Sequence, residues 1–334
     1  MTTSRNSASK TKASEQEQTA RSTAHLNPYT ILRPQHSKGP DMEALHIDRL
    51  SKSFGEVQAL REMSFSVHPG EIYGFVGSNG AGKSTTMRIA LGVLQADSGE
   101  VRLGDTPMND NLRRRIGYMP EERGLYAKEK IADQLKFLGQ LHGMDASAAQ
   151  HSATALLERL GLADRANDKL ETLSLGNQQR VQLAASLIHS PDLLILDEPF
   201  SGLDPVAVNV MSDMLVDRAK AGVPVVFSSH QLDLVQRLCD RVGIVTKGQM
   251  KAEGSVDELR SRGPLHYEIH TPARNWYPAN TRLVEDTEHG VVLEASSTAQ
   301  DQEILHAALA AGPVHSFSRR IPHLTDLFQE VIEA

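Results

Sequence analysis

Residues 77–84 read Gly77-Ser78-Asn79-Gly80-Ala81-Gly82-Lys83-Ser84, and this stretch decides the fold. It matches the pattern of a phosphate-binding loop, with Thr85 directly after it. Glycines let the backbone wrap closely around phosphates, and a helix that starts at Lys83 directs its positive N-terminal end at the same anion. Lys83 adds a full charge against the β- and γ-phosphates, and the Ser84 hydroxyl is placed to bind Mg²⁺. We therefore predict that this loop binds ATP and is not a glycine-rich turn without a ligand.

The segments around the loop have the strand and helix patterns that such a loop requires. Glu71–Val76 is a short apolar strand, and Ser84–Leu94 carries apolar residues at helical spacing. Residues 130–190 are mainly helical in pattern. Further strands are expected at Ala44–Leu50, Ser64–His68, Leu193–Leu196, Val223–Ser228 and Arg241–Thr246. Strands that alternate with helices predict an α/β fold whose mostly parallel sheet is covered on both faces.

Two adjacent carboxylates follow the apolar strand Leu193–Leu196, namely Asp197 and Glu198. They lie at the carboxyl edge of the predicted sheet, where nucleotides bind in such folds. Side chains alternate along a strand, so the two acids cannot have the same role. We expect Asp197 to hold Mg²⁺ through water, and Glu198 to orient the attacking water and take its proton.

The chain divides into three regions. Residues 1–42 form a predicted disordered tail, because residues 1–40 are rich in Ser, Thr, Gln and Ala and lack periodicity. Its basic residues could touch anionic lipid or an acidic partner, but a solvated extension is the simpler interpretation. Residues 43–263 form the main domain. Residues 264–334, after the breaker Arg262-Gly263-Pro264, form a small accessory α+β domain that ends in a helix at Leu324–Ile332.

Composition excludes several other classes of protein. The 334 residues are 40% hydrophobic and 23% charged, which is ordinary for a globular protein. No apolar run approaches the ~18 residues needed to span a bilayer, and the N-terminus lacks the apolar segment of a secretory signal. One cysteine, Cys239, excludes an internal disulfide and fits the cytoplasm. The net charge of −7 argues against a nucleic-acid binder.

A second motif, Leu173-Ser174-Leu175-Gly176-Asn177-Gln178-Gln179-Arg180, lies shortly before the acidic strand and opens a helix. It resembles the LSGGQ signature of ABC (ATP-binding cassette) ATPases. The other motifs of that family follow in the same order along residues 44–254. The resemblance makes Phe54 the aromatic that stacks on adenine, residues 118–121 the Q-loop, residues 201–204 the D-loop with Asp204, and His230 the switch histidine. Without the resemblance, Phe54 could be a core aromatic and His230 an ordinary hydrogen-bonded histidine.

Two departures from the family pattern point to a branch. Glu121 stands where the family has glutamine, in the phrase PEERGLY, and would bring a carboxylate to the Mg²⁺. The signature has Leu175 and Asn177 in place of a glycine and the glutamine. It keeps Ser174 and Gly176, the groups expected to contact the γ-phosphate. Both departures resemble exporters that include sodium-efflux (NatA-like) and drug-efflux ATPases, in which a C-terminal appendage is common.

The resemblance implies an architecture and a mechanism. The fold would be a P-loop NTPase core with an antiparallel β subdomain and a helical subdomain, plus the accessory domain. ATP with Mg²⁺ would be held between two copies of the chain, because only one motif set is present. ATP binding would close this homodimer and hydrolysis would reopen it, moving a separate membrane permease that exports sodium or drugs. The chain would then be cytoplasmic and peripheral on the cytoplasmic face of the cell membrane.

Two other functions remain open from the sequence. A soluble ABC protein that acts on DNA or the ribosome usually has long coiled-coil insertions or two cassettes in one chain, and this sequence has neither. A binding module with an inactive site would not be expected to retain Lys83, Ser84, Asp197, Glu198 and His230.

Overall fold

The computed structural model describes residues 42–122, 124–261 and 265–333. Apart from Met42, the expected tail over residues 1–42 lies outside the described residues. So do Arg123 and the predicted boundary Arg262-Gly263-Pro264. Within the described ranges, no helix has both the length and the apolar character needed to cross a membrane.

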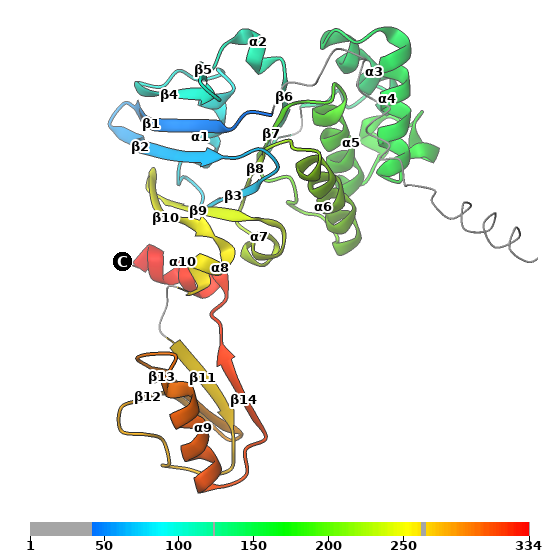
Figure 1. The fold of residues 1–334 in the computed structure, drawn as a ribbon. Helices are drawn as coiled ribbons and strands as arrows, with labels where there is room; N and C mark the ends of the chain where they lie inside the picture. The colour runs from blue at the N-terminus through cyan, green and yellow to red at the C-terminus, as the bar shows by residue number, and fades with distance from the viewer. Residues whose placement is uncertain (1–41, 123, 262–264, 334) are drawn as a thin grey trace, which may run out of the picture. The chain divides into compact units, whose positions relative to one another are not determined.

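A six-stranded sheet forms the centre of the main domain, in the order β10-β9-β3-β8-β7-β6 (Figure 1). Five strands are parallel, and β10 joins the edge antiparallel to β9. The strands are β3 (Ile72–Gly77), β6 (Ile116–Met119), β7 (Leu193–Leu196), β8 (Val225–Ser229), β9 (Arg241–Thr246) and β10 (Gln249–Ser255). This confirms the predicted α/β fold with a mostly parallel sheet. Because β3, β8 and β7 are neighbours, the phosphate loop and the two acids lie at one edge of the sheet.

Both faces of the central sheet are buried, as its apolar strands predict. In β7, Leu194 and Leu196 belong to one hydrophobic cluster, whereas Leu193 and Ile195 belong to a second cluster on the other face. All four side chains are at most 1% exposed. Because β7 is buried on both faces, all of its side chains are apolar and they do not alternate with polar ones.

A four-stranded antiparallel sheet covers one face, in the order β2-β1-β4-β5. It comprises β1 (Leu45–Phe54), β2 (Val57–Val67), β4 (Ser98–Leu103) and β5 (Thr106–Pro107). Phe65 of β2 joins it to the central sheet, because its ring lies 5.1 Å from that of Tyr73 and 4.9 Å from that of Phe75. The predicted strands at residues 44–50 and 64–68 are confirmed as parts of the longer β1 and β2, whose other residues are mostly exposed or half-buried and lack a regular apolar pattern.

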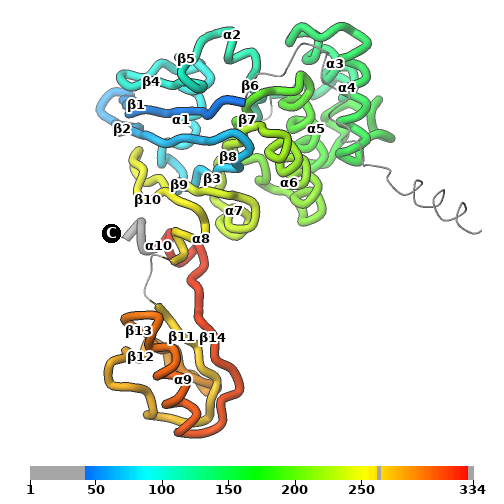
Figure 2. Tube along the Cα trace, viewed as in Figure 1, coloured from blue at the N-terminus to red at the C-terminus, as the bar shows by residue number. Residues whose placement is uncertain are grey.

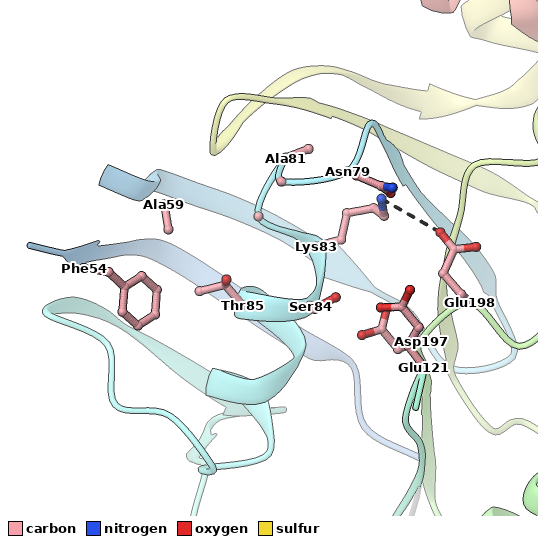
Figure 3. A pocket seen from close by; sticks show the side chains of 12 residues that line it. Phe54, Ala59, Asn79, Ala81, Lys83, Ser84, Thr85, Glu121, Asp197 and Glu198 are labelled. Carbon is pink, nitrogen blue, oxygen red and sulfur yellow. Dashed lines mark ion pairs between the residues drawn. The ribbon is translucent and has the colours of Figure 1, made fainter. Parts of the chain in front are cut away.

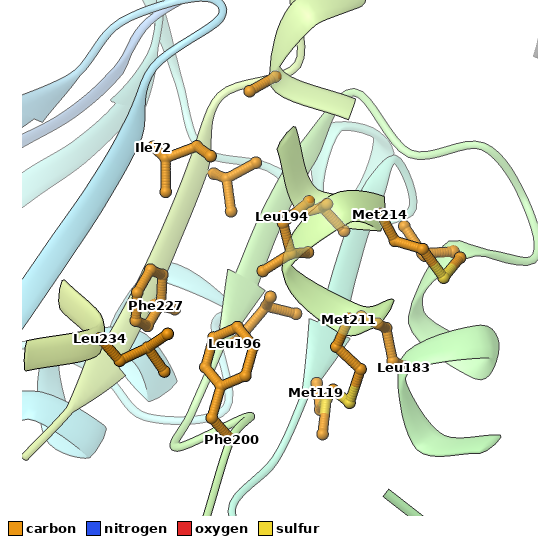
Figure 4. Packing of buried hydrophobic residues seen from close by; sticks show 14 of the residues in the cluster. Ile72, Met119, Leu183, Leu194, Leu196, Phe200, Met211, Met214, Phe227 and Leu234 are labelled. Atoms are coloured by element: carbon orange, nitrogen blue, oxygen red, sulfur yellow. The ribbon is translucent and has the colours of Figure 1, made fainter. Parts of the chain in front are cut away.

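Most helices of the main domain pack on the other face, and most of residues 130–190 are helical as predicted. The helices of the main domain are α1 (Lys83–Ala90), α2 (Asp110–Arg113), α3 (Ile131–Leu141), α4 (Ala146–Arg159), α5 (Leu175–Leu187), α6 (Pro205–Lys220), α7 (Leu232–Leu238) and α8 (Val256–Ser261). Short 3₁₀ turns, η2 (Ala163–Arg165) and η3 (Leu170–Thr172), precede α5. Figure 4 shows this core, where Leu194, Leu196 and Phe227 of the sheet lie with Met211 and Met214 of α6.

Helix α1 is shorter than the sequence predicts. The apolar spacing predicts a helix as far as Leu94, but the helix ends at Ala90, and Leu91 is the last residue with helical backbone angles. Gly92 then adopts φ +72°, the left-handed conformation that commonly ends helices. The apolar residues beyond it continue the helical spacing without continuing the helix.

The accessory sheet is the four-stranded sheet β12-β13-β11-β14, with α9 (Gln300–Ala311) packed on it. Its strands are β11 (Leu265–His270), β12 (Arg282–Thr287), β13 (Gly290–Ala295) and β14 (Ser316–Arg320). Residues of β11, β13 and α9, such as Ile269, Leu293 and Ile304, form a separate small core. β12 has no buried residue and no alternating pattern, so the sequence did not reveal it.

The last helix, α10 (Leu324–Glu333), packs on α7 and α8 of the main domain. The chain leaves α8, forms the accessory sheet and returns to α10, as Figure 2 traces. Leu324 and Leu327 are 0% and 9% exposed within the larger cluster of the main domain. The Leu324 N–H donates to Gln236 Oε1 of α7 at 2.9 Å, and Arg260 Nε donates to the Pro322 carbonyl at 2.8 Å. By its packing, α10 completes the core of the main domain.

We expect the loss of α10 to destabilise the main domain without removing the nucleotide motifs. A chain ending at Arg262 should still bind ATP but should melt at a lower temperature and tend to aggregate, because the apolar surface under α10 becomes exposed. In the full chain, Leu324→Ala should cost about 2–5 kcal/mol of unfolding free energy. Urea denaturation of Leu324→Ala measures this cost. Leu309→Ala is the control, because Leu309 is 56% exposed on α9. Equal stability of the two variants would contradict the packing role.

Candidate active site

The phosphate loop joins β3 to α1 and needs glycine at two positions for different reasons. Gly82 has φ +102°, and a Cβ there would lie 2.6 Å from Leu60 Cδ2 and 2.9 Å from the Ala59 carbonyl oxygen. Gly80 has φ +79° but no atom within 4 Å of its would-be Cβ. Residues with a Cβ rarely adopt this conformation. The lack of a side chain at Gly82 therefore lets the loop pack against β2, whereas Gly80 lies on the open, outer side of the loop.

Lys83 is the first residue of α1, and its ammonium group lies inside the loop. Nζ donates to the carbonyl of Gly77 at 2.7 Å and to that of Ser78 at 3.3 Å. The first turn of α1 holds no acidic residue, so no side chain there neutralises the positive end of the helix. A full charge and a helix N-terminus therefore meet at the loop, which suits a phosphate group.

The two acids after β7 point to different partners. Asp197 is 2% exposed, and its Oδ1 accepts a hydrogen bond from Ser228 Oγ at 2.5 Å. Glu198 Oε2 lies 2.9 Å from His230 Nδ1, while Oε1 lies 3.9 Å from Lys83 Nζ. Glu198 adopts φ +50°, in the left-handed region, and its carboxylate has a different partner from that of Asp197. The sharp turn after the strand thus gives two adjacent carboxylates separate surroundings.

These groups line one cavity of about 340 Å³, here called the nucleotide cavity. Its lining residues are Phe54, Ala59, Asn79, Gly80, Ala81, Gly82, Lys83, Ser84, Thr85, Glu121, Asp197 and Glu198. Figure 3 shows Phe54 at one end and the carboxylates at the other, with Lys83 between them. Phe54 is 50% exposed, and Lys52 Nζ lies 5.7 Å from the centre of its ring. The cavity has the apolar, cationic and acidic regions that a nucleoside triphosphate requires.

Comparison with known proteins identifies the family. The family model described as ABC transporter matches residues 60–201, and that of the C-terminal domain of DrrA1-3-like ATP-binding proteins matches residues 254–332. The chain is 37% identical over 294 residues to the uncharacterized ABC transporter ATP-binding protein YhaQ of Bacillus subtilis. This match covers 87% of the chain and 99% of the relative. The chain belongs to the family of ABC transporter ATP-binding proteins. It is the ATPase subunit of a transporter.

Other ABC proteins are also similar to this chain. The linearmycin resistance ATP-binding protein LnrL of Bacillus subtilis is 36% identical over 221 residues, covering 65% of the chain and 71% of the relative. A solved ATP-binding subunit of an ABC transporter has a TM-score of 0.61 at 28% identity, covering 65% of the chain and 92% of that structure. The dimeric bacterial ABC transporter cassette MJ0796 has a TM-score of 0.59 at 23% identity, covering 64% and 98%, and supports the fold alone.

The nucleotide cavity has a donor set that fits Mg²⁺. Ser84, Glu121 and Asp197 supply only oxygen, which Mg²⁺ prefers. Figure 3 shows the Ser84 side chain pointing toward the carboxylates of Glu121 and Asp197. Among the described residues, no group of three or more His, Cys, Asp or Glu side chains forms a ready metal cage. Mg²⁺ usually takes one or two protein carboxylates together with substrate phosphates and water, and this cavity offers Glu121 and Asp197.

The predicted signature and D-loop residues lie apart from the nucleotide cavity. Ser174 caps α5, where its Oγ accepts the Asn177 N–H at 3.4 Å, and Asp204 caps α6, where it accepts the Ala207 N–H at 2.8 Å. Ser174, Gly176 and Asp204 are not among the described residues that line the cavity. His230 also lies outside this lining but reaches the site through Glu198. The structure therefore brings together the phosphate loop, the two acids and His230, and places Ser174, Gly176 and Asp204 outside this cavity.

Sequence reasoning missed two residues around the site, Ser228 and Gln182, and included Tyr118 only as part of the predicted Q-loop. Ser228 bonds both acids. Gln182 of α5 donates to the Pro120 and Glu122 carbonyls at 2.6 and 3.3 Å, on either side of Glu121. Tyr118 lies near Asp197, and burial together with the Asp197 charge raises the pKa of its hydroxyl, so it stays protonated at neutral pH. The only sequence signal for Ser228 is a hydroxyl at the end of an otherwise apolar strand. For Gln182, the sequence shows only a polar residue within a helix.

Proposed function

We propose that this chain hydrolyses ATP in the nucleotide cavity to drive a separate membrane permease that exports a drug-like or antibiotic compound. The observation that supports this most directly is the meeting of Lys83, Asp197 and Glu198 in one cavity, with the aromatic side chain of Phe54 at its far end. Membership of the ABC family supplies the transport role.

Each residue of the cavity would have a distinct part in hydrolysis. Lys83 and the loop bind the β- and γ-phosphates, and Phe54 stacks on the adenine. Ser84, Asp197 and Glu121 hold Mg²⁺, which when bound neutralises charge on the phosphate oxygens. Glu198 accepts the proton of the attacking water, and His230 at 2.9 Å fixes the orientation of its carboxylate.

Glu121 lines the cavity, so its replacement should affect turnover. Glu121→Gln keeps an oxygen ligand and removes one negative charge, so ATPase activity should stay within about tenfold of wild type. Glu121→Ala should cost more, because the metal ion and the water both lose a partner. Side-by-side steady-state kinetics distinguish these variants. Wild-type rates in both would make Glu121 a surface charge. The alternative role for Glu121 is a surface ion pair with Arg123, a residue that lies outside the described ranges.

A homodimer would complete the site. The signature begins α5 at the surface, and Leu175 within it is 57% exposed. An exposed helix N-terminus complements an anion, so the signature of one copy can close over the triphosphate in the other. The dimeric structure of a cassette with the same fold is consistent with this arrangement. ATP binding would close the dimer and hydrolysis would reopen it.

The permease would dock beside the loop that carries Glu121. Tyr126 is 67% exposed there, and Phe137 and Leu141 of α3 are 51% and 66% exposed. A cavity of about 430 Å³ lies at this surface, lined by Tyr126, Glu129, Asp133, Gln134 and Phe137. Exposed aromatic residues around a hollow commonly mark protein contacts. Gln182 of α5 donates to the Pro120 carbonyl of the same loop, so a movement of this loop on docking would be transmitted to the signature helix.

The name of one relative favours a drug or antibiotic as the exported compound. LnrL is a linearmycin resistance protein, and the C-terminal segment matches the DrrA1-3-like domain. Sodium export, which the resemblance to the NatA-like branch also suggests, remains the alternative substrate class. A soluble ABC protein acting on DNA or the ribosome is the alternative of a different class.

Purification from membranes tests the proposal. The tagged chain, expressed with the permease gene nearest to its own, should copurify with that permease in detergent. Phe137→Asp should lose the permease and keep basal ATPase activity, because a charge replaces an exposed aromatic. Leu309→Asp, an equally exposed site on α9, is the matched control and should retain the permease. Recovery of the wild-type chain with ribosomes or nucleic acid in place of a permease would contradict the proposal.

A further inference from the structure

Ser228 connects the two acids of the site through one hydroxyl group. It lies in β8 and is 0% exposed. Its Oγ donates to Asp197 Oδ1 at 2.5 Å and accepts the Glu198 N–H at 2.8 Å. A serine hydroxyl has one proton and two lone pairs, so both bonds form at the same time.

The neighbouring strands explain why a serine can reach both acids. β7 and β8 are parallel neighbours, and Leu196 of β7 pairs with Phe227 of β8. Asp197, the residue directly after β7, therefore lies beside Ser228 of β8. The Asp197 N–H bonds the Met119 carbonyl of β6 at 2.8 Å, so its backbone is fixed from the other side. The serine adds the contact that orients the carboxylate itself.

Glu198 has a backbone conformation that needs support. Its φ of +50° is in the left-handed region, which side chains with a Cβ disfavour. The bond from its N–H to Ser228 holds this conformation at the start of the turn, and its carbonyl accepts the Ser201 N–H at 3.2 Å. Its carboxylate is held separately by His230. The direction of the Glu198 side chain therefore depends on a backbone that Ser228 fixes.

We propose that Ser228 is a positioning residue for ATP hydrolysis. It orients the Asp197 carboxylate and holds the Glu198 backbone, and it is not among the described residues that line the nucleotide cavity. This inference rests on the roles proposed above for Asp197 and Glu198. The competing explanation is that a small buried side chain merely fills space between the strands.

Two substitutions separate these explanations. Ser228→Ala removes both hydrogen bonds, and Ser228→Cys keeps the shape but offers only a weak donor and acceptor. Both should lower kcat for Mg-ATP about tenfold to a hundredfold, because the catalytic carboxylate moves. The KM for ATP should change less than about threefold, because Lys83 and the loop are intact. Ser186→Ala is the matched control, since Ser186 is also buried and its hydroxyl donates to the Leu183 carbonyl within α5, away from both acids.

Amide hydrogen exchange of the nucleotide-free chain supplies a second readout. The Glu198 N–H should exchange at least about tenfold faster in both Ser228 variants than in wild type or Ser186→Ala, because its acceptor is lost. Wild-type kcat in either Ser228 variant would overturn the inference. If only Ser228→Cys kept wild-type kcat, the side chain would merely fill space. Glu198→Gln is assayed alongside. If it is inactive while the Ser228 variants are normal, only the positioning role fails. If it also hydrolyses normally, the proposed role of Glu198 fails first.

Discussion

Lys83→Ala should abolish ATP hydrolysis and weaken ATP binding. The ammonium group lies inside the phosphate loop, bonded to the Gly77 and Ser78 carbonyls, and is 7% exposed. A charge-assisted hydrogen bond contributes about 1.5–3 kcal/mol, so its loss should raise the Kd for ATP about tenfold to 150-fold. Titration with a fluorescent ATP analogue measures the binding, and phosphate release measures turnover.

The control for this prediction is an exposed lysine away from the cavity. Lys220→Ala, at the end of α6, removes the same charge from the surface and should leave both quantities near wild type. If Lys83→Ala turned over ATP at the wild-type rate, the loop would not be the phosphate site. A loss of folding is detected by the melting temperature of the variant.

Glu198→Gln should trap ATP between two copies of the chain. Glutamine keeps the shape and hydrogen bonding of the side chain but cannot take a proton, so binding should persist while hydrolysis falls at least about a hundredfold. In gel filtration with ATP and Mg²⁺, the variant should elute as a dimer. Without nucleotide, it should elute as a monomer.

An exposed glutamate provides the comparison. Glu303→Gln on α9 removes the same charge and should hydrolyse ATP normally and show no trapped dimer. A Glu198→Gln variant that stayed monomeric with ATP and still hydrolysed it would mean that the base lies elsewhere. Stable ATP-bound dimers in both Glu198→Gln and Glu303→Gln would mean that the dimer does not depend on the loss of Glu198.

The sequence predicted the fold best where burial leaves a strong pattern. The runs at Leu193–Leu196 and Arg241–Thr246 are buried on both faces and coincide with β7 and β9. β12 is exposed along its whole length and carries no such pattern. Helix α10 was expected at the right place, within the accessory domain. Its apolar face packs on α7 and α8, and no local pattern reveals which core an apolar face will join.

The candidate site was predictable where one segment of chain carries the chemistry. The loop at residues 77–84 is contiguous, so its residues could be assigned by their order. Ser228 could not be assigned in this way, because its two partners follow a different strand. They come close to Ser228 only through the pairing of β7 with β8. Gln182 acts on the Glu121 loop across about sixty residues of sequence for the same reason.

Phosphate release by the purified wild-type chain, compared with Glu198→Gln under the same conditions with Mg-ATP, tests the central claim most directly. The claim is that this cavity hydrolyses ATP with Glu198 as the base. It predicts measurable turnover by the wild-type chain and a rate at least about a hundredfold lower in the variant. Equal rates in the two proteins, or no turnover by the wild-type chain with Mg-ATP bound, would contradict it.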